Sequence, residues 1–305
     1  MKKVIYEVNA FSDLPFGGNP AGVVPDATGL NSIQMLKISK EMNLSETAFI
    51  FPLENDQADY EVRFFTPTQE VDLCGHATIA SFFSLASKGI ISGISNVKHM
   101  KQKTKAGILP VEIYFNDSKI HSVMMTQAIP KFLFDVDDVC ELAGIMGIHV
   151  NDIGIEGYFL TPSAVSTGLT DIMLPLKSLS ALKGLKPNYA KLTEYSNKLN
   201  IIGVHAFTLE TEEKSSTVAC RNFAPAVGID EEAATGTSNG ALGAYLVEHK
   251  VLKFKDNITM ICEQGYYMNR PSKIIVRLEK NKGYLTVKVG GKAVIVREAL
   301  TSGIN

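Results

Sequence analysis

Two segments hold the residues whose types and spacing could do chemistry. The first, from Glu70 to Thr78, reads Glu-Val-Asp-Leu-Cys-Gly-His-Ala-Thr, and the second, from Glu231 to Gly243, reads Glu-Glu-Ala-Ala-Thr-Gly-Thr-Ser-Asn-Gly-Ala-Leu-Gly. Each places acidic residues before a glycine and leads into an apolar run of small residues, which is typical of a buried helix. Helix N-termini offer unpaired N–H groups and partial positive charge, so the two segments predict a duplicated unit and a cleft for a substrate carboxylate.

His76 follows Cys74-Gly75 at the start of the first predicted helix. A histidine there can simply satisfy a local backbone group, but it can also donate a proton or a hydrogen bond to a substrate. We favour the second interpretation, because the paired segment supplies the other wall of the cleft. The remaining histidines show no ligand spacing, so no metal is predicted. They are His99, His121, His149, His205 and His249.

Cys74 lies at the same helix start. A helix N-terminus can activate a thiol, but racemases that use two thiol bases need a second cysteine on the opposite face, where this chain has Thr235. Cys74 is therefore interpreted as a small packing residue. The four cysteines are widely spaced and form no CxxC pair, so neither a disulfide framework nor a zinc site is indicated.

Three glutamates precede apolar segments. From spacing alone, Glu46 is a solvated residue at the start of a strand. Glu231 and Glu232 precede the second helix, where they could be partners of the helix dipole or members of a site, and the spacing leaves this open.

The glycines of the second helix form the pattern GxxxGxxG without a following lysine, which matches neither a Walker loop nor a dinucleotide fingerprint. Close helix packing explains Gly240 and Gly243 better. Asn19-Pro20 is predicted to form a turn that could also line the cleft.

The 305 residues suit two medium domains better than one large core. The composition is 45% hydrophobic and 20% charged with a net charge of -2, so a nucleic-acid partner is not expected. Glu7 and Asn9 interrupt the first apolar run, so it is not interpreted as a signal peptide. No apolar stretch is long enough to span a bilayer, so no membrane partner is expected. The default location is the cytoplasm.

The order of elements predicts an α+β fold of largely antiparallel sheets, because strands follow strands through short turns. Each of two similar domains is expected to wrap a curved sheet around a central helix, one within Ala77–Leu85 and one within Gly240–Val247. The boundary is placed at Gln127, which gives domains 1–127 and 128–305, with a C-terminal strand that can cross to the first domain. The segments Gly157–Leu160 and Asp171–Leu174 are predicted to be extended. Helices are predicted at Ser32–Met42, His76–Ser87, Val136–Ala143 and Gly236–His249.

The chain resembles the phenazine-biosynthesis PhzF-type isomerases, which are relatives of diaminopimelate epimerase. The resemblance covers nearly the whole chain. A single motif would be weak evidence, but the motifs taken together are highly specific for this family. They are Phe16-Gly-Gly-Asn-Pro-Ala-Gly-Val-Val, Leu44-Ser-Glu-Thr-Ala-Phe, Arg63-Phe-Phe-Thr-Pro-Thr-Gln-Glu-Val-Asp-Leu-Cys-Gly-His-Ala-Thr, Val165-Ser-Thr-Gly, Phe223-Ala-Pro-Ala-Val-Gly-Ile, Gln264-Gly with Arg270-Pro-Ser, and Val289-Gly-Gly-Lys-Ala-Val.

The resemblance implies a homodimer without cofactor, whose active site lies between the two domains and takes a small carboxylate. It assigns proton transfer to Glu46, against the interpretation from spacing, and gives assisting roles to His76 and Glu232. The predicted substrate-binding residues are Asn19, Gly75, Gly236 and Thr237.

Glu232 stands where the family usually has aspartate, and Thr237 where serine is common. One extra methylene moves a carboxylate by about an ångström. A displacement of this size can strongly lower the rate of a reaction that depends on the position of the carboxylate. Three functions therefore stay open: an isomerase that moves a proton between carbons of an unsaturated carboxylate, an epimerase or racemase of the same superfamily, and a metabolite-binding protein without catalysis.

Overall fold

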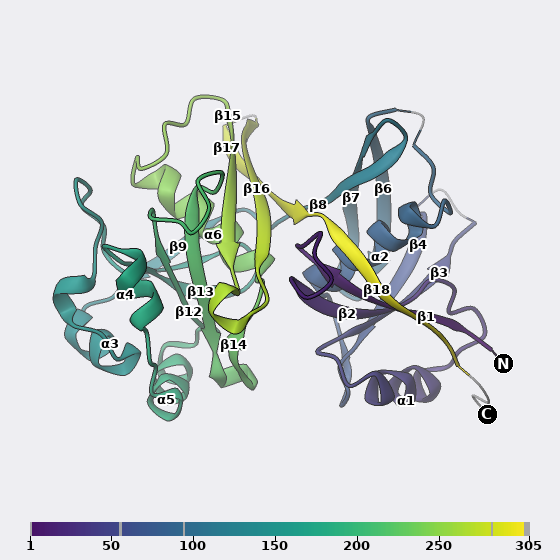
Figure 1. Cartoon of the computed structure of the whole chain (residues 1–305), viewed down its shortest axis with the longest axis horizontal. Coiled ribbons are helices and arrows are strands. Elements are labelled where there is room, and N and C mark those ends of the chain that lie inside the picture. Colours follow the sequence, from purple (N-terminus) through teal and green to yellow (C-terminus); the bar gives the residue numbers. More distant parts are fainter. Residues whose placement is uncertain (1, 55–56, 94, 282, 302–305) are drawn as a thin grey trace. The chain divides into compact units, whose positions relative to one another are not determined.

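The computed structural model describes residues 2–54, 57–93, 95–281 and 283–301. The chain splits into two compact units (Figure 1). The first contains Met1–Thr126 with Gly290–Asn305, and the second contains Gln127–Val289. No helix in the described ranges is long and apolar enough to cross a membrane.

The first unit is a curved sheet in which most neighbouring strands are antiparallel. Two pairs, β2–β3 and β4–β6, are parallel, and each is joined through a helix. The order across the sheet is β18-β1-β2-β3-β4-β6-β7-β8, with the short β5 also beside β4. The bounds are β1 Val4–Ala10, β2 Asn19–Val24, β3 Thr47–Pro52, β4 Tyr60–Phe65, β5 Glu70–Val71, β6 Val97–Thr104, β7 Gly107–Asn116, β8 Lys119–Thr126 and β18 Ala293–Leu300.

The second unit repeats this order. Its strands follow as β9-β10-β11-β12-β13-β15-β16, with β14 beside β13, and the parallel pairs are again two, β11–β12 and β13–β15. The bounds are β9 Lys131–Asp135, β10 Ser163–Ser166, β11 Thr170–Pro175, β12 Gly203–Thr208, β13 Val218–Ala224, β14 Ile229–Glu232, β15 Asn257–Gln264, β16 Ser272–Asn281 and β17 Tyr284–Gly291.

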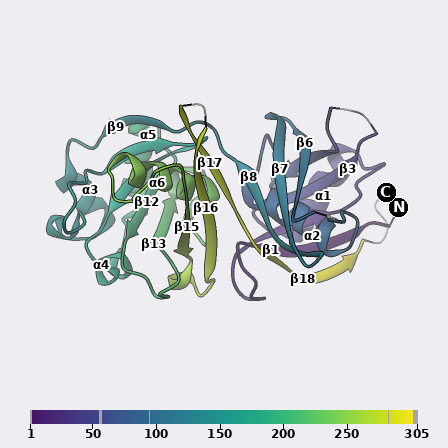
Figure 2. The ribbon, with the colours of Figure 1, turned by 90° about the horizontal axis from the view of Figure 1, so that it is seen from above.

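One helix runs through the inside of each sheet: α2 (Gly75–Ser87) in the first unit and α6 (Gly236–Glu248) in the second. The strands around α2 are visible from above in Figure 2. Ten of the 13 residues of α2 and nine of the 13 of α6 are buried, against three of the 11 in the outer helix α1 (Ser32–Met42). The predicted α+β fold of two similar domains, each a sheet around a central helix, is confirmed.

Small residues allow α6 to lie this close to its sheet. A Cβ atom added at Gly240 would stand 2.9 Å from a methyl of Val289, and one added at Gly243 would stand 3.0 Å from a methyl of Val276. The predicted packing role of these glycines is confirmed. The remaining helices are α3 Val139–Met146, α4 Leu179–Gly184 and α5 Tyr189–Leu199.

Some local predictions differ from the structure. Gly157–Leu160 is not a strand: Tyr158 makes one isolated bridge to Ile155 inside a turn. Asn19-Pro20 is not a turn but the beginning of β2, where Pro20 lies opposite Asn9 of β1. The helix predicted from Val136 begins at Val139, because the side chain of Asp138 caps it by accepting from Glu141 N–H.

Gly203 at the start of β12 is a position where a side chain has no room. A Cβ atom there would lie 1.9 Å from the carbonyl oxygen of Phe223 and 2.9 Å from Cα of Ala224, both backbone atoms of β13. Gly203→Ala is therefore expected to lower the free energy of unfolding by about 1–3 kcal/mol or more, as overpacking does. Urea unfolding measures this.

Gly184→Ala is the matched control, because nothing lies within 4 Å of the added Cβ. Equal stability of the two alanine variants would contradict the assigned close approach of β12 and β13.

Candidate active site

Glu46 is the residue before β3. Its carbonyl oxygen accepts a hydrogen bond from Gly22 N–H of β2 at 3.0 Å. Gly22 has no side chain to obstruct this pairing, since a Cβ there would lie 2.6 Å from Oγ1 of Thr47. The parallel pairing of β2 and β3 therefore sets the position of the Glu46 backbone. The Glu46 side chain is 20% exposed, but its Oε2 is buried, and no group in the described ranges donates a hydrogen bond to it.

His76 lies in the first turn of α2 and is 8% exposed. Its Nε2 is 3.3 Å from Oε2 of Glu46 and 3.3 Å from Oγ of Ser45. The hydrogen-bond geometry is met with Ser45, which explains how Glu46 Oε2 can be close to the ring without being bonded to it. The fold thus brings an imidazole and an unsatisfied carboxylate oxygen together.

Cys74, the residue that precedes α2, is the third reactive side chain at this place. Its Sγ lies 3.5 Å from Nδ1 and 3.9 Å from Nε2 of His76. The thiol is buried and forms no disulfide.

The starts of the two central helices differ from those of the other helices. Among the six α-helices in the described ranges, α1, α3, α4 and α5 each have an N-cap side chain that accepts a backbone N–H. Cys74 and Thr235, the N-cap residues of α2 and α6, provide no such bond. The first N–H groups of a helix have no partner within the helix. The first backbone N–H groups of each central helix, beginning at Gly75 and Gly236, are therefore not bonded by the side chain of the N-cap residue.

The other predicted substrate-binding residues lie near these starts or on a neighbouring strand. Thr237 is in the first turn of α6, and its carbonyl oxygen accepts from Oγ1 of Thr167 at 2.9 Å. Asn19 is the first residue of β2 and is 5% exposed. A Cβ added at Gly75 would meet no atom within 4 Å, so the space over this glycine is open.

In the second unit, Glu232 is held by Thr235, the residue that precedes α6. Its Oε2 accepts a hydrogen bond of 2.6 Å from Oγ1 of Thr235. Gln264 at the end of β15 links the same parts: its Nε2 donates to the Glu232 carbonyl oxygen at 2.7 Å, and its Oε1 accepts from Thr235 N–H at 3.1 Å and from Asn239 Nδ2 at 2.8 Å. Gln264 was not among the predicted site residues, although the motif Gln264-Gly marked it.

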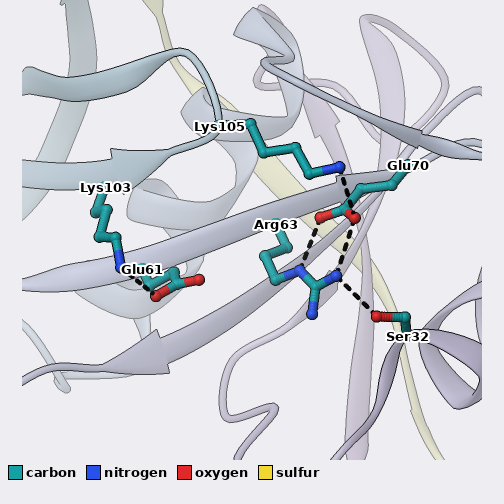
Figure 3. A network of polar contacts seen from close by, with 6 residues as sticks. All are labelled: Ser32, Glu61, Arg63, Glu70, Lys103 and Lys105. Carbon is teal, nitrogen blue, oxygen red and sulfur yellow. Dashed lines mark hydrogen bonds and ion pairs between the residues drawn. The ribbon is translucent and has the colours of Figure 1, made fainter.

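One ion pair in the first unit fixes the segment that leads into α2 (Figure 3). Arg63 of β4 donates from Nε and Nη2 to the two carboxylate oxygens of Glu70 at 2.7 and 2.9 Å. Its guanidinium also donates to Ser32, and Lys105 lies 2.9 Å from the same carboxylate. The hydrogen bonds from Arg63 hold the pKa of Glu70 below its usual range. The neighbouring pair of Glu61 and Lys103 is more exposed.

The second unit repeats this ion pair. Arg221 of β13 donates from Nε and Nη2 to Glu231, both at 2.8 Å. Each arginine also lies over the phenylalanine two positions later, at 5.3 Å for Phe65 and 4.8 Å for Phe223. Each glutamate precedes the first residue of its central helix by five positions, from 70 to 75 and from 231 to 236. Arg221 therefore holds Glu231 five residues before the start of α6.

Asp171 and His205 are buried titratable side chains of the second unit. Burial raises the pKa of Asp171 to about 6, although Ser238 donates to its Oδ2 at 2.5 Å; the charge of Glu232 adds to the rise. Burial lowers the pKa of His205 to about 4, although Nδ1 lies 2.9 Å from Oδ1 of Asn222. Asp171 therefore keeps its proton up to about pH 6, and His205 stays neutral down to about pH 4.

These two groups are expected to act on stability in opposite directions. Between pH 6.5 and 4, His205 is protonated in the unfolded chain but not in the folded protein. The contribution of His205 to the free energy of unfolding therefore falls as the pH falls. Between pH 3.8 and 6 the folded protein keeps a proton at Asp171 that the unfolded chain has lost, so this term lowers stability as the pH rises. Each term reaches about 3 kcal/mol, at 1.36 kcal/mol per pKa unit.

Asp171→Asn removes one of the two terms. Relative to the native protein, this variant is expected to lose about 3 kcal/mol of unfolding free energy as the pH falls from 6 to 4. Urea unfolding of both proteins across this range measures the difference. A constant difference between them at all these pH values would contradict the raised pKa of Asp171.

A cavity of about 420 Å³ lies in the second unit, beside the C-terminal half of α6. Ala244, Val247 and Glu248 of this helix line it together with Lys255 and Lys280. None of the predicted site residues lines this cavity, so it is separate from the candidate site.

Known proteins are similar to this chain along nearly its whole length. A family model described as phenazine biosynthesis-like protein (PhzC-PhzF) matches residues 8–299. An uncharacterized isomerase of Clostridium acetobutylicum is 38% identical over 297 residues, which cover 96% of this chain and 95% of the relative. The trans-2,3-dihydro-3-hydroxyanthranilate isomerase of Pseudomonas chlororaphis is 31% identical over 288 residues, which cover 94% and 95%. The crystal structure of a PhzF family protein of Bacillus anthracis superposes with a TM-score of 0.89 at 30% identity and covers 99% of both chains.

Proposed function

This chain belongs to the phenazine biosynthesis-like family and is an isomerase, and we propose that it moves a proton between carbon atoms of a small unsaturated carboxylate without a cofactor. Glu46 is the proposed acid/base. The observation that carries this proposal is the Glu46 Oε2 atom, which is buried, accepts no hydrogen bond from the described residues and lies 3.3 Å from His76 Nε2. A carboxylate oxygen without a donor is ready to take a proton.

The proposed reaction gives the predicted site residues separate roles. Glu46 removes a proton from one carbon of the conjugated system and returns it to another. His76 polarises or orients the substrate from its position beside Glu46. The free N–H groups at the helix starts, beginning at Gly75 and Gly236, bind the substrate carboxylate, and Asn19 and Thr237 assist.

Glu232 is the proposed assisting acid of the second unit. Its carboxylate is fixed by the 2.6 Å hydrogen bond from Thr235, so the longer side chain has one preferred position rather than several. The same bond occupies the hydroxyl at the place where a thiol racemase would carry its second cysteine, which favours the isomerase over the epimerase.

The substrate class is proposed from the relatives. The P. chlororaphis relative is named for trans-2,3-dihydro-3-hydroxyanthranilate, a cyclic unsaturated carboxylate. We infer that this chain acts on that compound or on one with the same arrangement of a carboxylate beside a conjugated double bond.

The test is proton NMR in D2O with this compound and a panel of related cyclic and enoic carboxylates. Deuterium that enters a carbon position in the presence of the native chain identifies the substrate class and establishes proton transfer. Saturable binding without exchange on any compound would contradict the isomerase and favour the metabolite-binding alternative.

A further inference from the structure

Three side chains of the first unit bring together three kinds of metal ligand. A carboxylate oxygen of Glu46, the thiol sulfur of Cys74 and a ring nitrogen of His76 lie within 4.8 Å of one another. Among the described residues this is the one group of at least three histidine, cysteine, aspartate or glutamate side chains with this spacing. We propose that these residues bind a zinc ion, and that the bound ion reversibly blocks proton transfer by Glu46.

Two of the three distances between the ligand atoms are close to those around one tetrahedral ion. Zinc binds nitrogen and oxygen at about 2.0–2.2 Å and sulfur at about 2.3 Å. In a tetrahedron these bonds place nitrogen and oxygen about 3.3 Å apart, and sulfur about 3.6 Å from either of them. His76 Nε2 lies 3.3 Å from Glu46 Oε2 and 3.9 Å from Cys74 Sγ. The Glu46 oxygen and the Cys74 sulfur lie within 4.8 Å of each other, and a bound ion would draw them together to about 3.6 Å.

The unsatisfied oxygen of Glu46 is an independent reason for a ligand here. Oε2 is buried and accepts no hydrogen bond from the described part of the chain. A buried polar atom without a partner costs free energy, and a cation bonded to Oε2 would remove this cost. The nearest ring, His76, is itself more than nine-tenths buried.

The kinds of ligand select the metal. Thiolate and imidazole prefer zinc and its neighbours among the transition metals over magnesium and calcium, which prefer oxygen. On binding, Cys74 gives its thiol proton to solvent, and the thiolate and carboxylate together balance the two charges of the ion. Three protein ligands leave a fourth position open for water or for a substrate carboxylate.

The metal would inhibit the reaction because it would bind the side chain that transfers the proton, Glu46. The Glu46 oxygen that would accept the substrate proton is the one that would bind zinc, so both cannot happen at once. This part of the inference rests on the proposed function, whereas binding of the ion does not.

Metal binding is tested with cobalt(II) as a spectroscopic probe and zinc by calorimetry, on the full chain after treatment with a chelator. The native protein is expected to bind one equivalent of cobalt, with the near-ultraviolet charge-transfer band of a cobalt–thiolate bond. Cys74→Ala is expected to lose this band and to bind zinc at least about 100-fold more weakly, more than the loss from a residue that only supports a ligand. Cys74→Ser tests the same bond with a conservative side chain, and circular dichroism checks the folding of both variants.

Cys140 offers the matched control, because it is an exposed cysteine in α3 of the second unit. Cys140→Ala is expected to keep the band and the affinity of the native protein. A band that persists in Cys74→Ala, or that disappears in Cys140→Ala, would overturn the assigned site.

The inhibition is tested by the ratio of deuterium exchange with and without zinc. This ratio is expected to fall at least 10-fold in the native protein at saturating zinc, to return on addition of a chelator, and to stay near one in Cys74→Ala at the same concentration. A cobalt–thiolate band without any exchange on the substrate panel would contradict the proposed function and leave the metal site standing. A band together with exchange that zinc does not change would overturn the inhibition.

Discussion

Glu46→Gln is expected to lower the rate of carbon–deuterium exchange by about 10²–10⁴-fold, the usual contribution of a positioned general acid or base. The amide has the size of the carboxylate but cannot take up the substrate proton. Because Glu46 Oε2 accepts no hydrogen bond within the described residues, the substitution breaks no such bond at this atom. The change should therefore appear in the chemical step rather than in stability. Exchange of the best substrate found in D2O, followed by proton NMR, is the measurement.

Glu61→Gln is the control for this experiment. Glu61 lies in β4 of the same unit and forms an exposed ion pair with Lys103 at 3.0 Å (Figure 3). It should keep native exchange, and thermal unfolding of both variants should match the native protein. Native exchange in Glu46→Gln would remove Glu46 from the mechanism.

Glu231→Gln is expected to lower the free energy of unfolding by about 3–5 kcal/mol, because it leaves the charge of Arg221 buried without its partner. The side chains of the two residues are only 10% and 13% exposed. Arg221 also donates to the carbonyl oxygens of Leu182 and Leu185 at the end of α4, so it cannot turn outward into water without losing those bonds. Urea unfolding of the variant against the native protein measures the loss.

Two comparisons separate the buried pair from an ordinary ion pair. Glu61→Gln breaks the exposed pair with Lys103 and should change stability by less than about 1 kcal/mol. The double variant Arg221→Met/Glu231→Gln should lose less than the sum of the two single losses, because neither charge is left alone. A loss in Glu231→Gln no larger than that in Glu61→Gln would show that the pair does not hold the entry to α6.

The sequence predicted the elements whose apolar pattern is strong. Ser32–Met42 is the observed α1 to the residue, and the two central helices begin within one residue of their predicted starts. Both central helices are apolar around most of their circumference, and such a helix has to be buried whatever surrounds it. The duplication was also visible, since each segment carries acidic residues, a glycine and small residues in the same order.

Other features of the fold could not be predicted from the pattern of neighbouring residues in the sequence. The strand β2 contains Asn19-Pro20, a pair that favours a turn when only its neighbours in sequence are considered. Pro20 is tolerated because β2 is held between β1 and β3 by other residues, such as Gly22, whose N–H bonds to Glu46. Asp171–Leu174 was predicted to be a strand, but the burial of Asp171 was not predicted. In the structure, Ser238 of α6 donates a hydrogen bond to the buried Asp171 carboxylate, and this contact joins residues that are far apart in the sequence.

The family, the α+β class and the two helix starts were predictable from the sequence, because they follow from local composition and from motifs that are continuous in the chain. Where those motifs lie relative to one another within a unit depends on tertiary contacts. Glu46 reads as a solvated residue by spacing, yet the pairing of β2 with β3 and the entry of α2 place its buried Oε2 3.3 Å from His76. A contact between residues from different elements depends on register and burial, and neither is encoded in the spacing of one segment.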